Sequence, residues 1–284
     1  MTDIVDVSKI SLNQLMLTEL QEYLSANAIL LPTIWDFSDK VEAGAVSFDV
    51  PRVTGGDTAA WPTAGAKATT GGVTIDVDKC LINQYRQYST YITDEDRSKT
   101  SADLDGYFFD IAPSKLGDEI EQFIYTEIKK ASAATPDNIQ QLSGASNLVP
   151  TVGDIFKLAE LMDTANLPKS DRFAVMGPAA YYALIQNDAI INGSKSLSNE
   201  ALVNGAFSKV AGITLLYSTN ITAGEMVGYH RQALAFAFGN GNAVQAVQAR
   251  NEDEFRDFRA LKGLYGSKIL DAGKRTFLFN ATGA

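Results

Sequence analysis

Apolar residues recur at helical spacing near the start of the chain, across residues 12–28, and predict one amphipathic helix there. Ser11 is a suitable residue to cap its first turn, and Pro32 prevents the helix from continuing. Two roles fit this pattern equally well. The helix is either part of the chain's own core or an arm that docks on a neighbouring molecule.

Apolar and polar residues then alternate in two short runs, which is the period of a half-buried β-strand. The apolar positions are Val46, Phe48 and Val50 in the first run and Val73, Ile75 and Val77 in the second. Residues 54–72 between the runs are small, polar and glycine-rich, with one large aromatic side chain, Trp61. A structureless loop of this length is uncommon inside a compact domain, so we expect an extended hairpin that projects from the body. Because such a hairpin buries too little surface to be stable alone, we expect it to rest on another molecule; a disordered surface loop is the alternative.

Helical spacing returns in two stripes, at residues 104–111 and 116–128. At about 100° per residue the two stripes point in roughly opposite directions. Pro113 lies between them and would remove a helix hydrogen bond. We therefore expect two helices, or one helix with a sharp kink at Pro113.

From Leu148 onward, helical and strand patterns alternate. Thr151 with Asp154 three residues later is typical of a helix start, and Pro178 suits the first position of a second helix. The expected strands cover residues 173–176, 213–217, 226–229, 234–238, 244–247 and 276–279, with a charged stretch at 250–259. Together these elements predict a mixed α+β fold without an internal repeat.

Composition and net charge exclude several classes of protein. The 284 residues are 45% hydrophobic and 20% charged, which is ordinary for one large globular domain or two smaller ones. The net charge of -10, without a Lys/Arg cluster, disfavours direct nucleic-acid binding. No run approaches the roughly 20 apolar residues of a membrane-spanning helix. Asp3 and Asp6 argue against a signal peptide.

Candidate chemistry is sparse. His230 is the only histidine and Cys80 the only cysteine, whereas zinc sites usually need several such ligands. We read His230 as an exposed residue of a turn between strands. Residues 239–242 (Gly-Asn-Gly-Asn) favour a hairpin turn over a phosphate-binding loop, and residues 94–96 (Asp-Glu-Asp) a solvated turn or helix cap over a calcium site. We expect no catalytic site, metal or cofactor. The alternative function, of a different class, is a soluble enzyme of unknown mechanism.

The segment from residue 88 to 96 (YSTYITDED), followed by Thr100, Leu104 and the helix pattern at 116–128, resembles the major capsid proteins of tailed bacteriophages. Trp61, Gly65 and the strand at 73–77 fall where that family carries an extended loop. Further matches lie at residues 166–168, 172–178, 210–213 and 218–220. They cover most of residues 45–280, and their order and spacing make the combination specific.

The resemblance implies the fold shared by tailed-phage and encapsulin shells. An N-terminal arm would cover residues 1–44 and an extended two-stranded loop 45–84. A peripheral domain with a spine helix would take 85–147 and 245–284, and an inserted axial domain 148–244. Pro113 departs from the long uninterrupted spine helix of that family.

The resemblance also implies a function: self-assembly as hexamers and pentamers into an icosahedral head around double-stranded DNA, located in the virion and assembled in the host cytoplasm. The implied partners are other copies of the chain, a portal and decoration proteins, with DNA enclosed without sequence-specific binding and no membrane. Because the arm begins almost at Met1, we expect a separate scaffolding protein. An encapsulin-type cellular compartment is the alternative. The expected contacts between subunits are Arg52, Trp61, Arg250, Glu252, Glu254, Arg256 and Arg259.

Overall fold

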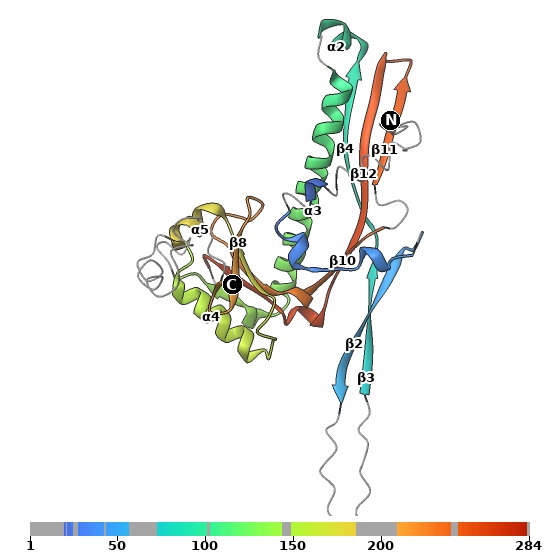
Figure 1. The fold of residues 1–284 in the computed structure, drawn as a ribbon. Coiled ribbons are helices and arrows are strands. Elements are labelled where there is room, and N and C mark those ends of the chain that lie inside the picture. The colour runs from blue at the N-terminus through green and yellow to red at the C-terminus, as the bar shows by residue number, and fades with distance from the viewer. Residues whose placement is uncertain are drawn as a thin grey trace, which may run out of the picture.

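The computed structural model describes residue 20 and residues 22–24, 28–42, 44–56, 73–100, 103–143, 149–185, 209–239 and 244–282. Figure 1 shows a long blade, a rounded part beside its lower half, and a two-stranded ribbon that projects away from both. The mixed α+β fold and the extended ribbon agree with the sequence-based expectation. No helix among the described residues is long and apolar enough to span a membrane.

A five-stranded sheet forms the blade. Its strands are β1 (Trp35–Asp36), β4 (Gln84–Thr93), β10 (Leu234–Phe238), β11 (Val244–Asn251) and β12 (Arg256–Ile269). The long strand β12 pairs antiparallel with β4 along one side and with β11 and then β10 along the other. β4 and the full length of β12 were not expected from the sequence.

One helix, α3 (Leu104–Ala133), runs along this sheet (Figure 1). Its buried stripe recurs every four residues: Phe108, Ala112, Leu116, Ile120, Ile124 and Ile128. The expected break or sharp kink at Pro113 is therefore wrong. Pro113 forfeits only the bond to the Phe109 carbonyl, and buried residues precede and follow it on the same stripe. Tyr107, which lies at an apolar position of the stripe expected at 104–111, is instead 66% exposed.

The N-terminal segment packs on the same helix. Residues 20 and 22–24 are helical, and Leu20 and Leu24 are buried against the core that α3 builds. The described part of the helix expected at 12–28 is thus a core element of its own chain; residues 12–19 lie outside the described part. Two short 3-10 turns follow, η2 (Leu31–Thr33) and η3 (Ser38–Lys40).

A buried carboxylate fixes this segment to α3. The Glu121 carboxylate accepts hydrogen bonds from the backbone N–H groups of Leu30, at 3.0 and 3.1 Å, and of Leu31, at 3.0 Å. Thr33 Oγ1 lies 2.6 Å from the hydroxyl of buried Tyr229. Two backbone N–H groups of this segment thereby find an acceptor on the distant helix α3, and a side-chain hydroxyl finds a partner on a distant strand, as buried polar groups require.

The rounded part is built on a six-stranded sheet. Across the sheet the strands are β5 (Ile139–Gln141), β13 (Thr276–Asn280), β9 (Met226–His230), β6 (Arg172–Met176), β8 (Ile213–Tyr217) and β7 (Lys209–Val210). Two helices pack on it, α4 (Val152–Thr164) and α5 (Pro178–Ile185). Thr151 and Asp154 form the expected capping box at the start of α4. The strands expected in this region are all present, and Pro178 begins α5.

The ribbon consists of β2 (Ser47–Gly56) and β3 (Val73–Leu81), paired antiparallel. At its base Phe48, Val50 and Cys80 are buried against Ala235 and Leu270 of the body. Its opposite face is exposed. Trp61 and the other residues from 57 to 72 lie outside the described part of the chain.

Two expectations about turns have different outcomes. Residues 94–96 form the first turn of α2 (Asp94–Lys99), which Thr93 caps, so the helix-cap interpretation is confirmed.

The expectation of an exposed His230 is wrong. His230 ends β9 and is 3% exposed, and its Nδ1 accepts a hydrogen bond from the Gln232 N–H at 3.2 Å. Burial, reinforced by Arg275, lowers its pKa. β10 and β11 flank the expected glycine turn, whose residues 240–243 are not described.

Removing the Glu121 carboxylate should weaken the attachment of the N-terminal segment. In Glu121→Ala two backbone N–H groups lose their acceptor, so we expect the free energy of unfolding to fall by about 2–4 kcal/mol. Urea denaturation measures the change. Glu119→Ala, on the exposed side of the same helix, is the matched control and should stay within about 0.5 kcal/mol of wild type. Equal losses in both variants would contradict this role.

Glu121 should also make stability depend on pH. Burial raises the pKa of its carboxyl, the nearby Asp118 charge adds to the rise, and the Leu30 and Leu31 amides oppose it. The folded chain then keeps a proton that the unfolded chain loses above about pH 4.3. Stability should therefore fall as the pH rises from that value through the raised pKa. Denaturation at several pH values should show this slope in wild type and not in Glu121→Gln; parallel profiles would contradict it.

Candidate assembly interface

The end of the blade gathers most of the charged residues that the sequence singled out. There β11 turns into β12 through residues 252–255, and α2 lies above the end of β4 (Figure 1). Phe255 in this turn is 67% exposed and has a positive φ of 47°. A large apolar side chain is thus presented to solvent at the blade tip.

Arginines surround one buried carboxylate at this tip. Asp257 is 6% exposed and pairs with Arg97 at 2.8 Å, Arg250 at 3.1 Å and Arg259 at 3.5 Å. Arg250 also pairs with Asp94 at 2.6 Å, and that hydrogen bond lowers the pKa of the Asp94 carboxyl. The charges of Arg250 and Arg259 are therefore already engaged within their own chain.

Arg256 lies on the other face of β12 from these groups. Its guanidinium carbon is 4.1 Å from the centre of the Tyr91 ring, and it forms an ion pair with Glu254. Glu252 is exposed in the turn. Cation–π contacts at exposed sites contribute about 0.5–1 kcal/mol, so this contact stabilises the position of Arg256 only weakly. The Arg256 side chain is one-third exposed.

Arg52 is separate from the tip, near the base of the ribbon. It pairs with Asp78 across the ribbon at 3.4 Å and with Asp271 of the turn η7 (Asp271–Gly273). Arg275 also pairs with Asp271, at 2.7 Å. Arg52 therefore ties its own ribbon to the body. The structure brings five of the seven predicted contact residues together, leaves Arg52 apart and does not describe Trp61.

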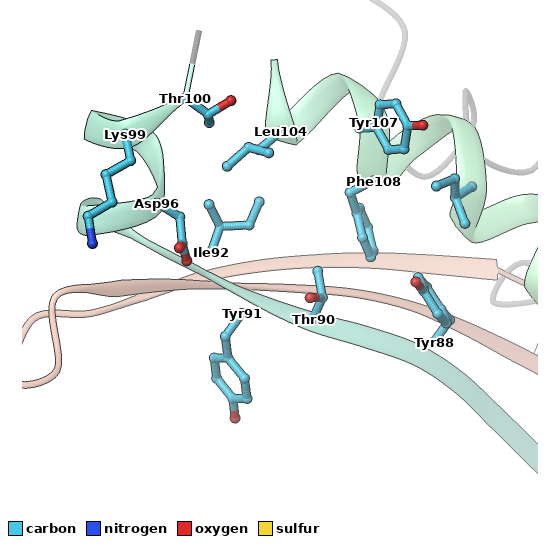
Figure 2. A pocket seen from close by; sticks show the side chains of 11 residues that line it. Tyr88, Thr90, Tyr91, Ile92, Asp96, Lys99, Thr100, Leu104, Tyr107 and Phe108 are labelled. Atoms are coloured by element: carbon cyan, nitrogen blue, oxygen red, sulfur yellow. The ribbon is translucent and has the colours of Figure 1, made fainter. Parts of the chain in front are cut away.

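A pocket that sequence reasoning missed lies between β4, α2 and the first turns of α3, with a volume of about 490 Å³. Figure 2 shows Thr90 and Ile92 of β4 pointing toward α3, where Leu104 and Phe108 face them, while Tyr91 points the opposite way. The Tyr88 and Phe108 rings stack at 5.8 Å. The sequence of β4 carries three tyrosines spaced three residues apart, at 85, 88 and 91, and this spacing is not the two-residue period of a strand.

Two kinds of site can be examined among the described residues, a metal site and a reactive thiol. The described residues contain no group of three or more His, Cys, Asp or Glu side chains placed to hold a metal ion. Cys80 is fully buried, and burial raises the pKa of its thiol to about 12. A thiol in this state is a poor nucleophile.

Comparison with solved structures identifies the class of fold. The chain is similar to a structure from Mycobacterium phage Che8, with 18% identity, a TM-score of 0.67, and coverage of 90% of this chain and 92% of that one. It is also similar to the capsid of cyanophage P-SCSP1u (18%, TM-score 0.66, coverage 89% and 87%) and to a virus-like particle from Pyrococcus furiosus (13%, TM-score 0.59, coverage 95% and 100%). No protein-family model and no curated protein matches the sequence. The chain therefore has the fold of tailed-phage capsid proteins, as the sequence resemblance implied.

Reversing the charge of Arg256 should damage assembly without unfolding the chain. Arg256→Glu replaces a cation that is one-third exposed and whose contacts are worth about 0–1 kcal/mol each, so the urea midpoint should hardly change while the assembled fraction in sedimentation falls. Arg259→Glu is less informative, because it would place a second carboxylate beside buried Asp257. Lys157→Glu, an exposed cation on α4, is the control. Normal assembly of Arg256→Glu would remove this residue from the interface.

Proposed function

We propose that this chain is the major capsid protein of a tailed bacteriophage. It is a structural subunit that assembles as hexamers and pentamers into an icosahedral head around double-stranded DNA, and it is not an enzyme. The observation that carries the proposal is the likeness to phage capsid structures along about nine-tenths of the chain. A likeness restricted to one sheet would not have distinguished a shell subunit from other α+β proteins.

The exposed ribbon supports the proposal independently. A two-stranded hairpin is at best marginally stable alone, and the outer face of β2–β3 leaves Val53, Ile75 and Val77 largely exposed. Exposed apolar patches of this kind mark interaction sites. A subunit that packs against further copies would cover them.

The proposed parts of the subunit are those of the shell fold. The N-terminal arm takes residues 1–44, the extended loop 45–84, the peripheral domain 85–147 with 245–284, and the axial domain 148–244. The sheets cross these boundaries: β5 and β13 of the peripheral ranges pair into the axial sheet, and β10 of the axial range pairs with β12 in the blade.

The proposed setting is the virion, after assembly in the host cytoplasm with a scaffolding protein, a portal and decoration proteins as partners. DNA is enclosed without sequence-specific binding. The net charge of -10 supports this arrangement, because an acidic wall does not hold phosphates and so does not impede filling of the shell.

An encapsulin-type compartment is the second candidate. The likeness to the Pyrococcus furiosus virus-like particle, which covers 95% of this chain, favours it, although the TM-score of 0.59 is below the 0.67 of the Che8 structure. The two candidates differ in what the shell encloses. Nucleic acid in shells isolated from infected cells supports the phage head, and a co-purified enzyme supports the compartment.

Negative-stain microscopy of the purified chain should show closed shells or capsomers. Deleting residues 55–71 should leave a folded body with a normal circular dichroism spectrum that assembles poorly, because the deletion removes the last two residues of β2 and the chain that links β2 to β3. A chain that remains monomeric at every salt and protein concentration tested, with or without scaffolding protein, would overturn the proposed function.

A further inference from the structure

Two short turns carry the chain between the two sheets, and they are bonded to each other. The turn η6 (Arg231–Ala233) leads from β9 of the six-stranded sheet to β10 of the blade, and η7 leads from β12 of the blade to β13 of the six-stranded sheet. The Leu270 N–H donates to the Ala233 carbonyl at 2.9 Å, and the His230 N–H donates to the Arg275 carbonyl at 3.2 Å. The two turns and these bonds form a crossover joint between the sheets.

The buried side chain of His230 holds the first of these turns closed. Its Nδ1 accepts the hydrogen bond from the Gln232 N–H that caps η6. The Gln232 side-chain oxygen in turn accepts a hydrogen bond from the Arg275 guanidinium, at 2.8 Å. The imidazole ring is thus connected through Gln232 to the second crossing.

The capping hydrogen bond requires a neutral imidazole. A neutral ring has one N–H group, so Nδ1 accepts a hydrogen bond only while the proton is on Nε2. The imidazolium ion has N–H groups at both nitrogens and accepts none. A second proton therefore turns Nδ1 into a donor that faces the Gln232 N–H, which is also a donor. The cap is lost, and two donors oppose each other in a buried place.

The surroundings of the ring act on its protonation in both directions. Burial lowers the pKa of His230 most, and the guanidinium groups of Arg275 and, more weakly, Arg172 lower it further. The Asp171 carboxylate and the Ser170 carbonyl favour the charged form. The ring is therefore neutral when the joint is closed, and it faces both cations and acceptors when it takes up a proton.

Carboxylates moderate the repulsion from the two arginines. Arg275 pairs with Asp271 at 2.7 Å, and Arg172, opposite His230 on β6, pairs with Asp163 at 2.7 Å. Arg231, the charged residue of η6 itself, is exposed. Protonation of the ring therefore costs chiefly the burial of a charge and the loss of the cap.

A cavity of about 300 Å³ lies beside the ring. Trp35 of β1, Ser170 and Asp171 before β6, and the turn η6 line it together with His230. The space is large enough for several water molecules. A proton can therefore reach the ring without unfolding of the chain, and a released η6 has room to move.

We propose that His230 is an acid-sensitive lock on the crossover joint: the neutral imidazole holds η6 closed, and the imidazolium ion releases it. The lock lies within one chain and does not depend on the proposed function. Its direction follows from the pKa of His230, which is lower in the folded chain than the unfolded value of about 6.5. The contribution of His230 to stability is complete above that pH and is lost as the pH falls through the lowered pKa. Glu121 acts in the opposite direction, so variants must separate the two effects.

Nuclear magnetic resonance of the full-length chain tests the protonation state directly. His230 is the only histidine, so the nitrogen signals of its imidazole need no assignment. At neutral pH they should show the proton on Nε2 and none on Nδ1, and on acidification the second proton should bind with a midpoint below that of the denatured chain. A neutral ring with its proton on Nδ1 would overturn the proposal, as would a ring that stays neutral until the chain unfolds.

Two variants and hydrogen exchange test the release of the turn. His230→Asn keeps an acceptor, because asparagine is a good capping residue, but it does not titrate. One pH unit below the midpoint, charged rings outnumber neutral ones about tenfold. The protection of amides 231–233, expressed relative to their intrinsic exchange rates, should therefore fall about tenfold from neutral pH in wild type and hardly at all in His230→Asn.

His230→Phe keeps a ring but lacks the acceptor, so its amides 231–233 should be poorly protected at both pH values. Equal losses of protection in wild type and His230→Asn would contradict the lock. If a variant does not fold, the titration of the wild-type ring decides the matter alone.

Discussion

The close packing around β12 is the constraint on which the remaining structure depends. A Cβ atom at Gly263 would lie 3.1 Å from Leu116 of α3, and one at Gly266 would lie 2.2 Å from the Leu81 carbonyl oxygen. The two positions differ by an odd number of residues, so they face opposite sides of the strand. Glycine at both places lets the helix approach on one side and the start of the β3–β4 link on the other. These two close approaches hold α3 against one face of β12 and the end of β3 against the other.

How far the sequence predicted the fold depended on how each element is buried. The strands of the six-stranded sheet had short apolar runs bounded by turn residues. Thr151 and Asp154 predicted the start of α4, because a capping box depends on hydrogen bonds between residues close in sequence. β12 is buried on both faces where it passes under α3: Ala260 and Leu261 are adjacent, and neither is exposed. A strand of this kind has no alternation to detect. β4 was missed for the opposite reason, because among its residues only Ile92 is buried.

The charged residues of the candidate interface could be found in the sequence, but their ion-pair partners could not, because these partners lie far away along the chain. The charged stretch from 250 to 259 was recognisable, yet Arg250 pairs with Asp94, 156 residues away in the sequence. The same holds for Arg52 and Asp271, which are 219 residues apart. A count of charges cannot tell whether each charge is satisfied inside the chain or offered to a neighbour. Only the folded structure makes that distinction. It shows that Arg250, Arg259 and Arg52 form ion pairs within their own subunit.

These pairings change where the free energy of assembly must come from. Exposed ion pairs contribute about 0–1 kcal/mol each. At the blade tip, Arg250 and Arg259 already form ion pairs with Asp257 of their own chain. The net charge of -10 meanwhile adds a long-range repulsion between copies. Contacts strong enough to overcome it must be short-range ones, namely buried apolar side chains and backbone hydrogen bonds. Along the described chain, the exposed apolar residues Val53, Ile75 and Val77 of the ribbon offer contacts of the first kind.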